Sequence, residues 1–430
     1  MFIYRDTVQQ LFELQKFSIK MGLSNITELC NFLESPQNKY PTIHVAGTNG
    51  KGSTCIVIKN ILSAHGLKCG LYTSPHLVDF RERIRINDEL IQKEFIIDFW
   101  KNISESVKKL NATFFDATTA MAFKYFEIQK VDVAIIETGL GGRLDSTNII
   151  SPEAVVITPI ARDHIKQLGT KTKGIVTEKA AIIKNGSTFF CGRQSKEVLS
   201  VLQNYESKAA KSYYFQNELL INISKWEKLY SNFDFTDKLR KQIYYNCRLD
   251  LPGFYQVDNA LLAYLVSRWY LEKKKIIFEE EKFRSALISV QWAGRLQLIS
   301  QKPEIYFDVS HNLAGLKATL SFVKKFFDKK RCHLLIGLLE DKEYELIAKR
   351  ISKYFSKIVV TEPVNQRALR GTILQKSFAR MEIETKFIKD IKDAFEFSIK
   401  YLPADHILFV MGSHFLIGNL LKVLAKKRLT

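Results

Sequence analysis

A lysine set among glycines, directly after an apolar run, restricts this chain more than any other feature. Residues 44–54 read HVAGTNGKGST, and the run TIHVAG leads into them. Glycine lets a backbone take positive φ or approach a ligand closely, and a lysine amid exposed amides favours a bound anion. A strand, a glycine-rich loop and a helix in this order predict a phosphate cradle, with Lys51 reaching the terminal phosphates of a nucleotide.

The spacing departs from the common G-x-x-x-x-G-K-[ST] pattern, because Val45 stands five residues before Gly50 and Gly52 precedes Ser53. A glycine-rich turn with Ser53 capping a helix would use the same residues. The apolar strand before the loop favours nucleotide binding. We assign these residues to the nucleotide loop: Gly47, Thr48, Asn49, Gly50, Lys51, Gly52, Ser53 and Thr54.

Apolar runs alternate with helical patterns up to about residue 190 and again from residue 304, as in EIYFDVS and HILFVMG. Such alternation indicates a mainly parallel sheet with helices on both faces. A chain of 430 residues exceeds the usual size of one core. We expect an α/β protein with a large P-loop-type domain, residues 1–294, and a smaller Rossmann-like domain, residues 295–430.

Two segments give weaker predictions. The first 40 residues predict two amphipathic helices, the second capped by Asn25. Residues 191–250 are rich in Lys and Tyr and have weak periodicity, so they predict only mixed helix and short strands.

Composition limits the function classes. Six cysteines show neither CxxC nor zinc-ligand spacing, which indicates reduced thiols in a cytoplasmic protein. Charges at Arg5, Asp6, Glu13 and Lys16 argue against a signal peptide or a membrane span. The formal net charge of +19 favours anionic ligands, but the lysines are dispersed. We therefore expect small anionic substrates, with neither nucleic acid nor membrane as a partner.

Polar residues follow the next apolar runs as well. Glu137 ends VDVAIIE and begins ETGLGGRLDSTN, where an acid at the carboxyl end of a parallel strand projects into the ligand crevice. It can hold the magnesium that ATP brings. The alternative is a helix-capping carboxylate. For Arg143 and Asp145, a structural ion pair is as good an interpretation as a functional role.

Two more strand ends deliver further candidates. Asp163 and His164 follow EAVVITPI, and Ser74 and His76 follow the run KCGLY. We expect His164 to bind metal or phosphate and Ser74 to offer its hydroxyl to the metal, although Ser74 can also simply begin a turn. In the smaller domain, YFDVSHN places Asp308, His311 and Asn312 after a strand. These residues either close over the nucleotide or form an ordinary turn.

With these residues assembled, the sequence resembles the folylpolyglutamate synthase and dihydrofolate synthase family of the Mur ligase superfamily. The resemblance runs through ordered blocks along nearly the whole chain, among them HVAGTNGKGST, LYTSPHL, TFFDATTAMAF, ETGLGGRLDSTN, EKAAIIK, WAGRLQ, DVSHN and VMGSHFLIG. It implies an amide ligase that uses ATP and two magnesium ions to activate a carboxylate as an acyl phosphate, which L-glutamate attacks. The implied acceptors are dihydropteroate and reduced folates.

Narrower and different functions stay open beside this one. A monofunctional enzyme would use only one acceptor, and another Mur-type ligase would use a different carboxylate. A nucleotide-dependent binding protein without chemistry is a third alternative. We expect a monomer.

The resemblance also implies roles for individual residues. Ser74, Glu137 and His164 match magnesium-associated positions, and Lys179 matches a carbamylated lysine that holds a second magnesium. Lys51, Lys179 and His164 would then act in catalysis. The nucleotide contacts matched are Asn259, Arg295, Asp308 and His311, and the positions matched near the pterin and glutamate sites are Arg83, Phe115, Asp116 and Thr119. Asp116 stands where glutamate is usual in the family.

Overall fold

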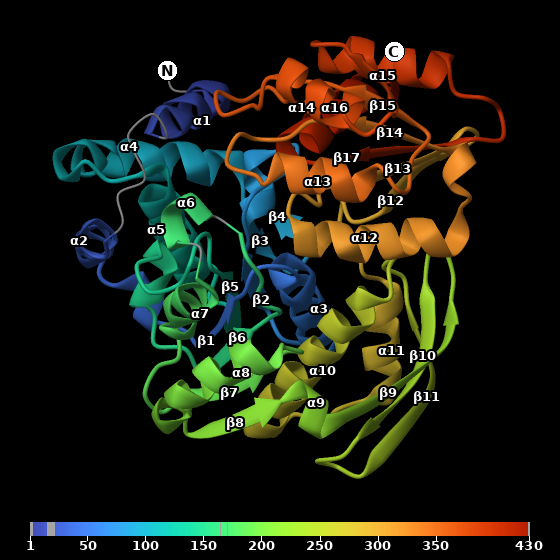
Figure 1. The fold of residues 1–430 in the computed structure, drawn as a ribbon. Coiled ribbons are helices and arrows are strands. Elements are labelled where there is room, and N and C mark those ends of the chain that lie inside the picture. Colours follow the sequence, from blue (N-terminus) through green and yellow to red (C-terminus); the bar gives the residue numbers. More distant parts are fainter. Residues whose placement is uncertain (1–2, 15–21, 164, 170, 429–430) are drawn as a thin grey trace.

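The computed structural model describes residues 3–14, 22–163, 165–169 and 171–428 (Figure 1). Its strands form three sheets of eight, three and six strands. In Figure 1 the six-stranded part, coloured orange to red, lies against the blue-to-yellow part that carries the other two sheets. The expected α/β class is confirmed.

The eight-stranded sheet is parallel from β2 to β8, and β3 and β4 add an antiparallel edge. Parallel strands are buried on both faces, which explains why these segments read as continuous apolar runs. In spatial order the strands are β4 (Glu89–Leu90), β3 (Ile84–Ile86), β2 (Cys69–Tyr72), β5 (Val133–Glu137), β1 (Thr42–Ala46), β6 (Ala154–Ile157), β7 (Thr188–Cys191) and β8 (Lys211–Tyr214).

Helices cover both faces of this sheet, because successive strand residues point to opposite sides. Val45 and Val156 belong to a core with one group of helices, whereas Ala46 and Ile157 belong to a core on the other face. The first face is covered by α3 (Lys51–Ala64), α10 (Tyr255–Lys273) and α11 (Glu280–Ile288). The second is covered by α1 (Tyr4–Glu13), α2 (Ser24–Phe32), α4 (Lys93–Leu110), α5 (Phe114–Ile128), α7 (Thr172–Ala180) and α8 (Lys196–Leu202).

The segment with weak periodicity forms an antiparallel three-stranded sheet, β9 (Leu219–Trp226), β10 (Ser231–Asp237) and β11 (Gln242–Leu249). Its central strand buries every second residue, so only one face is apolar. Two very short helices, α6 (Ile165–Leu168) and α9 (Phe215–Glu218), connect neighbouring elements. The strands are longer and more regular than the mixed structure expected from the sequence.

The six-stranded sheet has the order β12 (Gln297–Gln301), β13 (Glu304–Asp308), β17 (Ile407–Met411), β14 (Cys332–Ile336), β15 (Lys357–Val360) and β16 (Glu384–Phe387). One face packs on α12 (Leu313–Phe326), α13 (Tyr344–Ile351) and α14 (Gly371–Ala379). The other packs on α15 (Ile391–Lys400) and α16 (His414–Arg428). This is the smaller helix-covered sheet that the second series of apolar runs predicts. The division at Gly294 itself stays a prediction.

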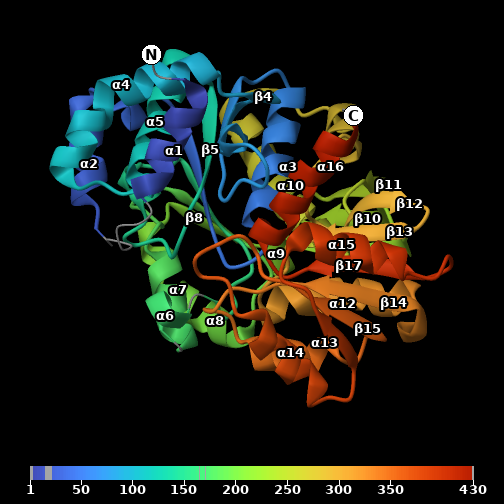
Figure 2. The ribbon, with the colours of Figure 1, turned by 90° about the horizontal axis from the view of Figure 1, so that it is seen from above.

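The two parts touch closely. In the view from above, α16 runs between the six-stranded sheet and the rest of the molecule (Figure 2). A Cβ at Gly418 of this helix would lie 2.0 Å from the carbonyl oxygen of Leu77. The glycine therefore lets the helix pack directly on the backbone that follows β2.

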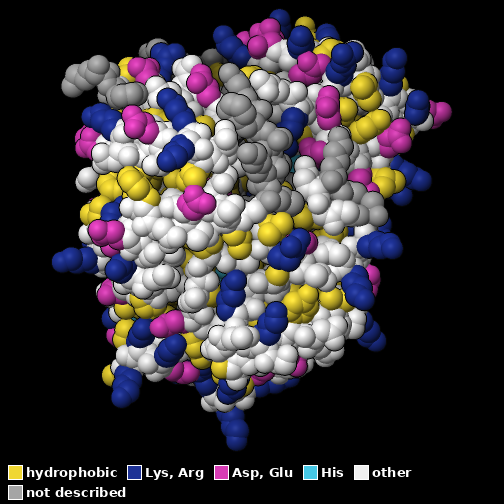
Figure 3. Space-filling model, turned by 90° about the vertical axis from the view of Figure 1, so that its left-hand side faces the viewer, with side chains coloured by type: hydrophobic (Ala, Val, Ile, Leu, Met, Phe, Trp, Pro, Cys, Tyr) yellow, Lys and Arg dark blue, Asp and Glu magenta, His cyan; other side chains and the backbone are white. Residues whose placement is uncertain are grey.

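The distribution of surface charge and the polarity of the helices bear on function. On the face shown in Figure 3, Lys and Arg side chains are spread among acidic and apolar ones rather than gathered in one patch. Over the part of the chain that the structure describes, no helix is long and apolar enough to cross a membrane.

One expected helix cap is wrong. Asn25 does not precede α2 but lies inside it, and its amide donates to the carbonyl of Asn111 instead.

Candidate active site

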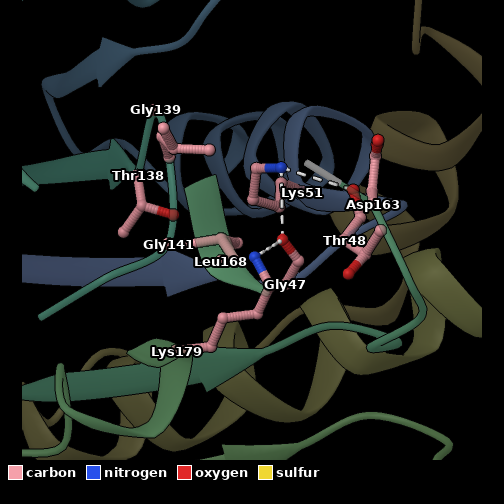
Figure 4. Close-up of a pocket in the computed structure, with 10 residues that line it drawn as sticks. Gly47, Thr48, Lys51, Thr138, Gly139, Gly141, Asp163, Leu168 and Lys179 are labelled. Atoms are coloured by element: carbon pink, nitrogen blue, oxygen red, sulfur yellow. Dashed lines mark hydrogen bonds between the residues drawn. The ribbon is translucent and has the colours of Figure 1, made fainter. Parts of the chain in front are cut away.

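A pocket opens where β1, β5 and β6 end, between the phosphate loop and helix α7 (Figure 4). Three strand ends predict such a crevice, since the carboxyl ends of parallel strands lie on one edge of a sheet. The residues that line it are Gly47, Thr48, Lys51, Thr138, Gly139, Leu140, Gly141, Asp163, Leu168 and Lys179.

Glycines shape the phosphate loop where no side chain fits. Gly50 precedes α3 with φ +87°, and a Cβ there would lie 2.4 Å from Oδ1 of Asn259. At Gly47 a Cβ would lie 1.9 Å from Oγ1 of Thr158. No side chain caps this helix, so the alternative in which Ser53 is the cap is wrong. The free amides at the helix start can receive an anion.

Two lysines converge on one carbonyl oxygen of this loop. Nζ of Lys179 donates to the carbonyl of Gly47 at 2.8 Å, and Nζ of Lys51 lies 3.3 Å from the same oxygen (Figure 4). Lys51 also donates to the carbonyl of Thr48. The two amines come from α3 and α7, which are far apart in sequence, and both residues line the pocket.

Lys179 is nearly fully buried, with 4% of its surface exposed. Burial, aided by the nearby charge of Lys51, lowers the pKa of Lys179 to about 7. A substantial fraction of this amine is therefore in the neutral, nucleophilic form near pH 7, unlike an ordinary lysine.

Glu137 is also buried and lies behind the pocket rather than lining it. Burial raises the pKa of its carboxyl group, while Lys51 and the backbone amide of Ser74 oppose that shift. The amide of Ser74 donates to Oε2 at 3.1 Å, so Ser74 and Glu137 lie together as the sequence predicts. The helix-capping alternative for Glu137 is wrong, because its partner is the end of a neighbouring strand.

Asp163 joins the pocket to the six-stranded part. One oxygen accepts a hydrogen bond from Lys342 at 2.7 Å, and the other accepts one from Asn312 at 2.9 Å. The amide groups of Asn49 and Asn312 also bond reciprocally, at 3.1 and 3.4 Å. Since Asn49 belongs to the phosphate loop, the smaller part contacts the nucleotide loop directly. His164, the neighbouring candidate, lies outside the described residues.

The remaining nucleotide candidates surround this loop. Asn259 packs against Gly50, and the charge of Arg295 acts on Glu137. Nε2 of His311 lies 3.5 Å from Oδ2 of Asp163. Asp308 is fully buried, and the amides of Leu296 and Ser310 and the hydroxyl of Thr319 donate to its oxygens. The turn interpretation therefore describes the local bonding of Asp308, while its nucleotide contact stays a prediction.

The acceptor candidates gather around the start of α5 and the end of β2. Nε of Arg83 donates to Nδ1 of His76 at 2.8 Å, and the guanidinium lies 5.1 Å from the ring centre of Phe114. Burial lowers the pKa of Arg83.

The other three acceptor candidates make structural contacts there. Phe115 fills the space beside Gly139, and the hydroxyl of Thr119 bonds that of Tyr72 at 3.1 Å. Asp116, inside the first turn of α5, accepts from the amide of the cap residue Thr113 at 2.9 Å and from the hydroxyl of Ser146 at 2.6 Å.

The ion pair suggested between Arg143 and Asp145 does not form. Arg143 instead pairs with Glu178 at 2.9 Å. Asp145 accepts from the amide of Leu140 and from Thr147. Asp145 therefore organises the loop after β5, and Arg143 ties that loop to α7.

The donor set fits a magnesium nucleotide better than a metal held by protein alone. Among described residues, which exclude His164, no three His, Cys, Asp or Glu side chains are placed to hold a metal. Magnesium prefers one or two carboxylates together with substrate phosphates and water. The hydroxyl of Thr54, at the end of the loop motif, is buried and has no described partner. Glu137 and Ser74 could hold the metal, and the glycine loop could hold the phosphates.

Lys342 is the clearest residue that sequence reasoning misses. It follows the apolar strand β14 in the run LLEDKE and is 9% exposed. The same rule of charged residues after a buried parallel strand would have found it. Trp292, whose ring fills the space beside Gly52, gave no comparable signal.

Comparisons with known proteins agree with this geometry. The Mur ligase middle domain matches residues 45–267, and the Mur ligase glutamate ligase domain matches residues 294–414. The chain is 32% identical over 427 residues to the dihydrofolate synthase/folylpolyglutamate synthase of Bacillus subtilis, which covers 97% of this chain and 98% of the relative. It is 31% identical over 375 residues to the folylpolyglutamate synthase of Lacticaseibacillus casei, covering 85% of this chain and 87% of the relative.

The solved structures agree as well. The structure of Escherichia coli FolC in complex with DHPP and ADP has a TM-score of 0.89 to this chain at 26% identity and covers 99% of both chains. The fold, the site and these matches define a Mur-type ligase, an ATP-dependent enzyme that joins a carboxylate to an amine. Within that class, the chain belongs to the folylpolyglutamate synthase and dihydrofolate synthase family.

Proposed function

We propose that this chain adds L-glutamate to dihydropteroate, making dihydrofolate, and to reduced folates, making folylpolyglutamates. The convergence of the Lys51 and Lys179 amines on the carbonyl of Gly47 carries the proposal, because it places the Lys51 cation and the buried amine of Lys179 together at the loop where the phosphates of ATP would lie. The relative from Bacillus subtilis bears both activities in its name, and the Escherichia coli structure holds ADP and DHPP.

In this proposal the acceptor carboxylate attacks the γ-phosphorus of ATP, ADP leaves, and an acyl phosphate results. The amine of L-glutamate then attacks the acyl carbon, and phosphate leaves. ATP and the carboxylate are both anionic, so most of the catalysis is positioning and electrostatic stabilisation. Lys51, Arg295 and His311 would oppose the charge that moves during transfer.

Two magnesium ions would bind in the same site. Ser74, Glu137 and His164 would hold the first, and a carbamylated Lys179 would help to hold the second. The lowered pKa of Lys179 supports this modification, because only a neutral amine reacts with carbon dioxide. Magnesium would neutralise phosphate charge when bound.

We assign the nucleotide loop and the acceptor site to residues 1–294 and the covering domain to residues 295–430. Asn259, Asp308 and His311 would line the nucleotide from both domains. Arg83, Phe115, Asp116 and Thr119 would surround the acceptor. The contact between Asn49 and Asn312 supports closure, which would keep water from the acyl phosphate.

The test is a substrate-dependence assay of ADP release. The proposal predicts release that needs L-glutamate together with either dihydropteroate or tetrahydrofolate, each assayed alone. Release with only one acceptor would establish the monofunctional alternative. Release that needs neither acceptor would contradict the proposal.

A further inference from the structure

A buried turn beneath the pocket links strand β1 to the loop after β5. We name residues 145–148 the DSTN turn and residues 139–142 the GLGG loop. The carboxylate of Asp145 accepts from the amide of Leu140 at 2.7 Å, from the amide of Thr147 at 3.1 Å and from the hydroxyl of Thr147 at 2.5 Å. Asp145 thus fixes the GLGG loop, whose residues Gly139, Leu140 and Gly141 line the pocket.

His44 supports this arrangement from inside β1. It is fully buried, and its Nε2 lies 2.8 Å from Oγ1 of Thr147. A threonine hydroxyl has one proton, which here goes to the carboxylate of Asp145. His44 must therefore donate through Nε2–H. Burial lowers the pKa of His44 to about 3, so the ring is neutral and Nδ1, which has no partner among the described residues, carries no proton. The contacts run in one direction, from His44 through Thr147 to Asp145.

The GLGG loop in turn holds the helix that carries Lys179. A Cβ at Gly142 would lie 2.6 Å from the carbonyl oxygen of Glu178 and 3.1 Å from Cα of Lys179. The amide of Arg143 donates to the same carbonyl at 2.8 Å. Since Nζ of Lys179 bonds the carbonyl of Gly47, just beyond the end of β1, the contacts close a ring around the pocket.

We propose that His44 is a positioning residue: through Thr147 and Asp145 it holds the GLGG loop, and with it Lys179, at a fixed place relative to the phosphate loop. The kinetic part of this inference rests on the proposed function. A misplacement of about 1 Å can slow an enzyme about 100-fold even when the change lies away from the reacting atoms.

Three variants test the relay. Thr147→Val removes the hydroxyl and keeps the shape of the side chain, whereas Thr147→Ser keeps the hydroxyl. Thr361→Val is the matched control, because Thr361 is fully buried and donates to the carbonyl of Lys389 at 3.0 Å in the six-stranded part. Thr147→Val and Thr361→Val each remove one buried hydroxyl group, and Thr147→Ser keeps it. Only the hydroxyl of Thr147 connects to the GLGG loop.

Amide hydrogen exchange of the peptide that spans residues 138–143 is the first readout, and it needs no substrate. Exchange should be at least about tenfold faster in Thr147→Val than in the wild-type protein and unchanged in Thr147→Ser and Thr361→Val. Equal exchange in Thr147→Val and Thr361→Val would overturn the inference.

Turnover is the second readout. Thr147→Val should lower kcat about 10- to 100-fold, with Thr147→Ser and Thr361→Val within about threefold of wild type. Loss of kcat in Thr147→Ser as large as in Thr147→Val would also overturn the inference.

His44→Leu should speed exchange and lower kcat as Thr147→Val does, and His44→Gln, which keeps a donor, should behave as Thr147→Ser does. Wild-type exchange and kcat in His44→Leu would show that Thr147 and Asp145 act without His44 and would overturn the inference. If Thr147→Val does not fold, the two His44 variants decide it. Wild-type protein without glutamate-dependent turnover would refute the proposed function. Amide hydrogen exchange would still decide whether His44, Thr147 and Asp145 hold the GLGG loop.

Discussion

At the scale of single residues, the state of Lys179 follows from its burial. The pKa of this amine falls from its ordinary value of 10.5 to about 7, because the folded protein removes it from water and places Lys51 beside it. A lysine in this state costs stability when charged and becomes reactive when neutral. Both properties can be measured without knowing the acceptor.

Lys179→Met should therefore change the pH dependence of stability. Below about pH 7 both folded and unfolded chains are protonated, so the folded state bears the full cost of the buried cation. Between about pH 7 and 10.5 the unfolded chain binds more protons, and wild-type stability rises with pH. The stability of Lys179→Met relative to wild type should thus be highest at about pH 6, and this difference in stability should become smaller by about pH 9.

Thermal midpoints in buffer free of carbon dioxide and nucleotide measure this effect. Lys171→Met, at an exposed position just before α7, is the control and should show no such trend. The same difference between Lys179→Met and wild type at both pH values would show that Lys179 is an ordinary lysine.

At the scale of elements, α3 offers a matched pair of glycines. Gly50 precedes the helix with φ +87°, and Gly66 follows it with φ +91°. A Cβ at Gly50 would meet Asn259, whereas a Cβ at Gly66 would meet nothing within 4 Å. Both positions strain any other residue, but only one also loses the close approach of the loop to α10.

Alanine at each position separates the two effects. Gly66→Ala should cost about 1–2 kcal/mol of stability through backbone strain and leave ADP binding unchanged. Gly50→Ala should weaken ADP binding at least about tenfold, because the loop must move away from Asn259. Calorimetric titration with ADP measures the ADP affinity of both variants, and thermal unfolding measures their stability. Equal ADP affinity in the two variants would refute the assigned loop.

The sequence predicts elements wherever one local rule acts alone. The apolar run before Gly47 and the glycines after it indicate β1, the loop and α3, because burial and positive φ leave local traces. Strand ends at Ser74 and Glu137 likewise predict their meeting, which the structure confirms. Asp163 lines the pocket together with Thr138, the residue after Glu137. For the antiparallel sheet β9–β11 the sequence predicts only mixed helix and short strands, because its half-exposed strands follow no continuous apolar run.

Contacts between distant segments could not be predicted. Lys342 binds Asp163 across 179 positions, and nothing local to either residue specifies its partner. The choice of Glu178 rather than Asp145 by Arg143 is similar, since it depends on how α7 packs on the GLGG loop. Side-chain pairing of this kind depends on the assembled core.

At the scale of the whole molecule, the ion pair of Lys342 and Asp163 joins the two parts. Both side chains are buried, at 6% and 8% exposure. Breaking a buried ion pair typically costs about 3–5 kcal/mol, and Lys342→Met removes a buried cation that hydrogen-bonds to Asp163. The pair of Lys357 and Glu384 is a natural comparison, because both partners are more than half exposed.

Lys342→Met should lower the thermal midpoint much more than Lys357→Met, since an exposed pair contributes about 0–1 kcal/mol. In solution scattering without nucleotide, Lys342→Met should also have a larger radius of gyration than wild type. Equal midpoints for the two variants, with an unchanged radius, would show that the contact does not hold the parts together.

The central claim is that this pocket transfers a phosphoryl group to a carboxylate before glutamate adds. The most direct measurement uses dihydropteroate whose carboxylate carries oxygen-18, incubated with the protein, ATP and L-glutamate. The acyl phosphate route predicts inorganic phosphate that contains one carboxylate oxygen-18 for each amide formed. Amide formation with phosphate free of the label would contradict that route.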